Sequence, residues 1–230
     1  DTSDQFALEM ALARIRQLSA HEVGHTIGLA HNFAASSKGR SSVMDYPHPT
    51  LSLNNGEVDF TDAYDTKIGD WDKVSIAYSY SEFKTDEDAN LKSILNDAFN
   101  NGARFITDQD ARPLGSAHAY AHLWDNGSDV SVELENLLLI RKNAIANFSK
   151  DNIKSNQPYS VLEDVFVPLY FLHRYQTEGV AKVIGGLDYT YAIKDDGNTI
   201  VKRIPGKLER KALASVIKTL SVEELAIPKK

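Results

Sequence analysis

The stretch HEVGHTIGLAHN, residues 21–32, places three histidines and one glutamate within twelve residues of a 230-residue chain that has seven histidines in all. From Ala11 to Leu29, residues of one helical stripe recur at spacings of three and four. This periodicity predicts one long helix over about residues 4–27, whose last turns carry the histidine-rich stretch. The members of the stripe are Ala11, Ile15, Leu18, Glu22, His25 and Leu29.

The three histidines are spaced so that they can share one metal ion. Residues four apart on a helix lie on the same face, so His21 and His25 project side by side. His31 follows six residues later, and Gly28 offers the left-handed backbone conformation that ends a helix and turns the chain back. The HExxHxxGxxH spacing arises by chance with a probability on the order of 10⁻⁵ under a composition-only model. A metal site with histidine ligands is therefore predicted.

The ligand set indicates zinc and leaves two interpretations open. Three neutral imidazoles with an open fourth position are typical of a catalytic zinc site, where water occupies the open position. The ion lowers the pKa of that water toward ~7, and Glu22, on an adjacent face of the helix, can take the proton. The competing interpretation is a non-catalytic helical binding module that retains a structural zinc site, with protein in the fourth position.

HEVGHTIGLAH resembles the metzincin zinc signature, and SVMDY, residues 42–46, resembles the Met-turn that follows it. The resemblance implies a zinc-dependent metallopeptidase that hydrolyses peptide bonds through a zinc-bound water, with Glu22 as general base. It implies that Met44 lies in a tight turn beneath the zinc ligands. Tyr46 would ligate zinc or stabilise the oxyanion, as in the astacin-like and serralysin-like branches.

The whole chain resembles the C-terminal region of a family of large bacterial zinc-dependent metallopeptidases of metzincin type. The resemblance implies a mainly α fold with few short strands. Residues 1–84 would form the lower half of a metzincin catalytic domain, with its active-site helix, Met-turn and closing helix, and residues 85–230 a helical C-terminal extension. The segments that carry this resemblance are IGDWDKVSIAYSY, TDQDARPLGSAH, LWDNG, VPLYFLHRYQ and GGLDYTYAIKDDG.

The same resemblance implies what surrounds the site. In metzincins a twisted sheet precedes the zinc helix, so an upstream part of the same polypeptide is expected to complete the cleft, and this chain to be an incomplete catalytic domain. A protein or peptide substrate and a periplasmic or extracellular location are expected on the same ground. The opening residues, DTSDQF, show no signal-peptide pattern.

Composition argues against several other functions. The net charge is −7 and no run of Lys or Arg is interleaved with aromatic residues, so nucleic acid is not an expected partner. The longest nearly apolar run, VFVPLYFL, is far shorter than the ~20 residues that span a bilayer. There is no cysteine, which excludes thiolate ligands and disulfides, and neither a GxSxG elbow nor a phosphate-binding glycine loop occurs.

Other polar residues are interpreted structurally. His118 and His122 are four apart but lack a neighbouring glutamate, which favours packing over a second metal site, and His173 is interpreted as a satisfied core histidine. His48 either lines the cleft or only adds polarity to a loop. The acidic residues in TDQDARP and WDNGSD lack EF-hand spacing and are interpreted as turn-forming: Asp108, Asp110, Asp125 and Asp129.

Periodicity and turn residues predict the remaining elements. A single helix over residues 160–186 would begin with a capping box of Ser160 and Glu163 and kink at Pro168. Hairpins are expected around NNG in LSLNNGEVDF and around DDGN. Further helices are expected over 68–83, 86–99, 131–148 and 207–220.

Overall fold

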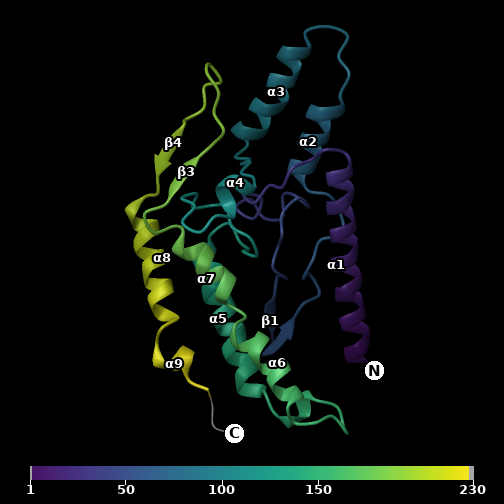
Figure 1. Cartoon of the computed structure of the whole chain (residues 1–230), viewed down its shortest axis with the longest axis vertical. Helices are drawn as coiled ribbons and strands as arrows, with labels where there is room; N and C mark the ends of the chain where they lie inside the picture. Colours follow the sequence, from purple (N-terminus) through teal and green to yellow (C-terminus); the bar gives the residue numbers. More distant parts are fainter. Residues whose placement is uncertain (1, 228–230) are drawn as a thin grey trace.

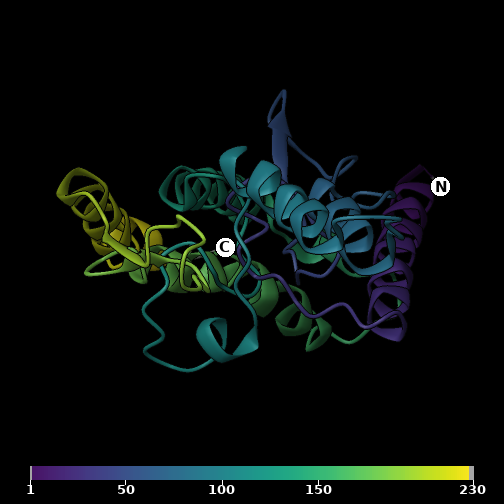
Figure 2. The same cartoon turned by 90° about the horizontal axis from the view of Figure 1, so that it is seen from above.

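The computed structural model describes residues 2–227, with side chains from residue 5 onward. This part of the chain is mainly helical, as predicted, with nine α-helices, one short 3₁₀ helix and two small antiparallel sheets. The long helix α1 (Thr2–Thr26) runs along one side of the molecule, and α8 (Gly206–Lys218) lies at the opposite side in both views (Figure 1, Figure 2). No helix within residues 2–227 is long and apolar enough to cross a bilayer.

The first part of the chain contains the elements expected around the histidines. Strands β1 (Ser52–Asn54) and β2 (Glu57–Asp59) pair through a two-residue turn in which Asn55 has φ 51° and Gly56 has φ 83°. Positive φ at both positions suits the twist of a tight hairpin, which confirms the turn predicted at NNG. Two helices follow, α2 (Asp70–Tyr80) and α3 (Glu87–Asn100).

The second part of the chain packs around one central helix. α5 (Val130–Asn147) buries Leu134 and Leu138 against Val180 and Ala212, which come from the two helices beside it. Burial of such side chains contributes about 1.5–3 kcal/mol each. The other elements of this part of the chain are α4 (Asp108–Ala111), η1 (Lys150–Asn152), α6 (Val161–Tyr170), α7 (Arg174–Ala181), α8 and α9 (Val222–Leu225).

The single helix predicted over residues 160–186 is wrong: the chain forms α6 and α7, separated by a turn. Pro168 lacks an amide hydrogen, and the carbonyl of Tyr170, the last residue of α6, accepts a hydrogen bond from Arg141 Nε at 2.7 Å. That carbonyl is therefore not used to continue the helix. The predicted capping box is also absent, since Ser160 makes no side-chain cap hydrogen bond.

A second hairpin closes the fold. Strands β3 (Leu187–Tyr189) and β4 (Val201–Arg203) are antiparallel, as predicted, although the loop between them is longer than the DDGN turn.

A second core lies between the first and second parts of the chain. It is formed by Phe33, Ala34, Ile106, Ala111 and Ala121, and Tyr46 packs against it.

Candidate metal centre

The three histidines of the predicted triad come together. His25 Nε2 lies 3.1 Å from His21 Nε2 and 3.1 Å from His31 Nε2, and the three nitrogens lie within 4.8 Å of one another. Two nitrogens bound to one tetrahedral zinc ion, at about 2.05 Å each, are roughly 3.3 Å apart. The observed separations therefore fit ligands of a single ion.

The other ring nitrogen of each histidine fixes the tautomer. Each Nδ1 contacts an oxygen that acts as acceptor, so Nδ1 carries the proton and Nε2 presents a lone pair to the centre. Three lone pairs facing one another are unfavourable unless a cation lies among them. The acceptors are the carbonyls of Val43 for His21 (2.7 Å) and Leu29 for His25 (3.0 Å), and Asp108 Oδ2 for His31 (2.8 Å).

The local backbone explains how the third histidine reaches the other two. α1 ends at Thr26, and Gly28 has φ 85°, the left-handed conformation predicted for it. His21 is 1% exposed, and burial lowers its pKa, which favours the neutral ring that a metal requires. Glu22 is exposed on α1 beside this buried ligand.

Asp108 is a site residue that the sequence interpretation missed. The sequence predicts a turn-forming role for Asp108, yet the residue begins α4 and accepts a hydrogen bond from His31, 77 positions away. Its other oxygen accepts from Arg112. Burial alone would raise the pKa of Asp108, but the bonds from His31 and Arg112 outweigh it and lower the pKa. The carboxylate is therefore held ionised next to a ligand.

Met44 lies directly against the helix that carries the histidines. Its side chain is 1% exposed, and a Cβ built on Gly24 would be only 2.2 Å from Met44 Sδ. Position 24 therefore admits only glycine unless the methionine moves. The sequence interpretation singled out Met44 but not Gly24, because their contact is not visible in the spacing of either residue.

A buried carboxylate holds this methionine turn in place. Asp72, on α2, is 1% exposed and accepts hydrogen bonds from Ser42 Oγ (2.5 Å), Val43 N (2.9 Å) and Gly69 N (2.6 Å). Val43 is the residue whose carbonyl orients His21. Asp72 thus connects α2 to His21 through one residue, Val43.

Tyr46 lies at the triad. Its hydroxyl is 3.2 Å from His31 Nε2, and its ring stacks on His21, with ring centroids 4.9 Å apart. Tyr46 is also held by Trp124. The Trp124 ring stacks on the Tyr46 ring, with centroids 5.3 Å apart, and the Trp124 amide donates to the Tyr46 carbonyl at 2.9 Å. Trp124 comes from the segment LWDNG and was not predicted as part of the site.

The other histidines lie elsewhere. Within residues 2–227 the triad is the only group of three or more potential ligating side chains close enough to hold an ion. His118 is buried and bonds the carbonyl of Tyr189, which agrees with packing. His173 was predicted to be satisfied, but its buried Nδ1 has no hydrogen-bond partner among the described residues, so that prediction is wrong.

Asp129, Asp110 and His48 lie outside the triad. Asp129 caps α5 by accepting from Ser131 N, as expected of a turn-forming residue. Asp110 accepts from the hydroxyls of two tyrosines of the second hairpin segment, Tyr189 and Tyr191. His48 is half-buried and does not join the triad.

Two histidines one helical turn apart are joined by a third beyond a left-handed glycine, and a methionine turn packs against their helix, which is the arrangement of a candidate metal centre of metzincin type. The chain belongs to the Met-zincin family, whose family model matches residues 3–230. It therefore has the fold of a metzincin-type zinc peptidase, with a histidine triad that can bind a metal ion. No curated protein matches the chain, and no solved structure matches it.

Proposed function

We propose that this protein is a zinc metallopeptidase that hydrolyses peptide bonds at the histidine triad. One observation carries the proposal: three Nε2 atoms converge while each Nδ1 is committed to an oxygen acceptor. That arrangement turns the Nε2 atoms of His21, His25 and His31 toward one point, as a zinc ion requires and ordinary packing does not.

The neighbouring residues have chemical roles that follow from their positions. A zinc ion held by the triad would supply Lewis acidity, lowering the pKa of water and polarising the peptide carbonyl. Glu22, adjacent to His21 and exposed, would accept the proton of the attacking water and return it to the leaving amine. The Tyr46 hydroxyl, at the edge of the triad, would donate a hydrogen bond to the oxyanion or ligate the ion.

Substrate and location follow from the same proposal. The substrates would be proteins or peptides. Family likeness favours a periplasmic or extracellular location. Cell fractionation of the natural host, with an antibody against this chain, would test the location separately from the chemistry.

Glu22→Ala tests the catalytic role. The variant should keep its zinc, because Glu22 is not a ligand, while kcat/KM on a quenched peptide pool falls by ~10²–10⁴. Glu9→Ala is the matched control, since Glu9 is also an exposed glutamate of α1 but lies three turns from the triad.

The same comparison of kcat/KM distinguishes the peptidase from the competing function, a binding module with a structural zinc site. If the zinc-loaded wild type shows no more peptidase activity than Glu22→Ala, the triad is a structural site in a binding module. A Tyr46→Phe variant that then loses zinc would identify the phenol oxygen as the fourth protein ligand.

A further inference from the structure

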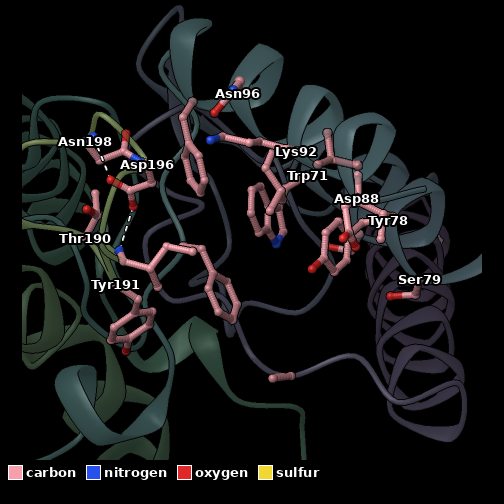
Figure 3. Close-up of a pocket in the computed structure, with 18 of the residues that line it drawn as sticks. Trp71, Tyr78, Ser79, Asp88, Lys92, Asn96, Thr190, Tyr191, Asp196 and Asn198 are labelled. Carbon is pink, nitrogen blue, oxygen red and sulfur yellow. Dashed lines mark hydrogen bonds between the residues drawn. The ribbon is translucent and has the colours of Figure 1, made fainter. Parts of the chain in front are cut away.

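A second cavity, separate from the triad, lies between α2, α3 and the loop that joins β3 to β4 (Figure 3). Its volume is about 710 Å³, within the ~300–1,000 Å³ typical of small-molecule sites. None of the three histidines, Glu22 or Tyr46 lines it. Four segments of the chain and Phe105 bound it, the segments being residues 28–30, α2, α3 and residues 190–198.

Aromatic rings form much of the wall. Trp71 stacks on Phe105, with centroids 5.3 Å apart, and also contacts Phe99 at 6.0 Å. Phe105 in turn meets the edge of Tyr191 at 5.8 Å. Rings arranged in this way leave faces and edges to which another ring can pack, and such contacts add about 0.5–1.5 kcal/mol beyond area burial.

The polar groups of the cavity include two donors without a partner, and Asp88 and Asp195 also line it. The indole N–H of Trp71 and the hydroxyl of Tyr78 have no hydrogen-bond partner among the described residues, and both turn toward the cavity in Figure 3. The Lys92 ammonium lies at the rim and donates to the Asp195 carbonyl at 3.4 Å. Asp196 is already engaged, because its carboxylate accepts from two amides of its own loop. The Trp71 indole and the Tyr78 hydroxyl can both donate to a ligand that carries a hydrogen-bond acceptor.

The cavity is connected to the metal centre through one residue. Leu29 lines it, and the Leu29 carbonyl accepts the hydrogen bond from Nδ1 of His25 at 3.0 Å. Ile27 lies two residues before Leu29, and its carbonyl accepts a hydrogen bond from the hydroxyl of Tyr80, on α2, at 2.7 Å. The arrangement that forms the cavity is therefore also the one that orients His25.

We propose that this cavity is a second binding site, for a small aromatic molecule that carries a hydrogen-bond acceptor, and that its occupancy strengthens zinc binding through Leu29. The second half rests on the zinc site of the proposed function. The sign follows from linkage: a ligand that selects the arrangement in which Leu29 orients His25 raises the affinity of the triad for zinc, and zinc raises the affinity for the ligand equally.

Benzophenone, with two rings, one carbonyl and the ability to crosslink under light, is a suitable probe. On metal-free protein it should label residues of this cavity. Ser75→Phe, which fills the cavity from α2, should weaken binding measured by calorimetry at least about tenfold. Ser93→Phe is the matched control, an exposed serine of α3 outside the cavity, and should bind as wild type. Circular dichroism verifies that both variants fold.

Tyr78→Phe tests the acceptor. Loss of one hydrogen bond should weaken benzophenone binding about fivefold, while diphenylmethane, which lacks the carbonyl, should bind both proteins equally. Labelling outside the cavity, or equal binding by the two serine variants, would overturn the site. Tighter competition by a phenylalanine-containing peptide than by any free aromatic ketone would overturn the choice of a small molecule.

Chelator competition measures the coupling. Saturating benzophenone should lower the zinc dissociation constant of wild type by about fivefold or more, with no change in Ser75→Phe. Absence of zinc binding without the probe would contradict the proposed function and leave the labelling result intact. Equal zinc affinity with and without bound probe would contradict the coupling alone.

Discussion

At the scale of single residues, the metal centre depends on what each histidine bonds with its second nitrogen. Two of the three rings donate to backbone carbonyls, and His31 donates to the carboxylate of Asp108. A carboxylate orients the ring and makes the ligand more basic than a carbonyl does. Arg112 pairs with the same carboxylate and keeps it in position. Asp108 is therefore a positioning residue for the third ligand.

Asp108→Asn should lower zinc affinity by about 10–100-fold, because outer partners of ligating histidines have effects of that size. Chelator competition at neutral pH is the measurement. Asp110→Asn is the control, since Asp110 lies on the same short helix but bonds Tyr189 and Tyr191 rather than a ligand. Equal losses in both variants would show that the effect comes from α4 as a whole.

The proximity of the three candidate ligands could be predicted from the sequence, and the residues that support them could not. His21, His25 and His31 lie within eleven residues, so helix geometry and one glycine bring them together. Asp108 and Trp124 reach the site only through the packing of distant segments. An aspartate in a short polar stretch is more often turn-forming than part of a site, and this is why the sequence predicts a turn role for Asp108.

At the scale of elements, the site depends on the fit between α1 and the methionine turn. Gly24 leaves room for Met44, and Asp72 of α2 fixes the backbone around Ser42 and Val43. The turn is thus held from both sides. The carbonyl of Val43 orients His21, so any shift of the turn is transmitted to a ligand.

Gly24→Ala tests this fit. In an open helix this change stabilises by about 1 kcal/mol, but here the added Cβ would lie 2.2 Å from Met44 Sδ. We expect a loss of about 1–3 kcal/mol in the free energy of unfolding measured with urea. In a Met44→Ala background the same change should be neutral or stabilising. A stabilised single variant would show that the methionine moves freely.

Helices that depend on local periodicity were predicted well, whereas the break between α6 and α7 was not. Pro168 was expected to kink one helix, but the bond from Arg141 to the Tyr170 carbonyl ends it. Arg141 lies on α5, 29 positions away, and is 2% exposed. A helix end set by a tertiary hydrogen bond leaves no local sequence signal.

At the scale of the whole molecule, the metal centre is built from both halves of the sequence. The division near residue 85 stays a prediction. Contacts nevertheless cross it at the site, from Asp108 to His31 and from Trp124 to Tyr46. Another crossing contact is buried: Ser36 Oγ donates to Asp125 at 3.2 Å. We therefore propose that the helical extension is a structural part of the centre.

The buried carboxyl at this crossing should give stability a characteristic pH dependence. Burial raises the pKa of Asp125 to about 7 from its ordinary 3.8, so the folded chain keeps a proton that the unfolded chain has lost. The contribution of the protonated Asp125 carboxyl to the free energy of unfolding is present below about pH 4 and is lost as the pH rises toward about 7. Asp125→Asn stays neutral, so its unfolding free energy relative to wild type should rise over that range, by at most ~1.4 kcal/mol per pH unit. Parallel stability curves would contradict this assignment.

X-ray absorption at the zinc edge tests the central claim most directly, because it counts the ligands of the bound ion. For zinc-loaded wild type we expect three imidazole nitrogens at about 2.0–2.1 Å and an oxygen in the remaining position. His25→Ala should lose stoichiometric zinc. A spectrum with fewer than three imidazoles, or unchanged zinc content in His25→Ala, would contradict the assignment of His21, His25 and His31 as the metal ligands.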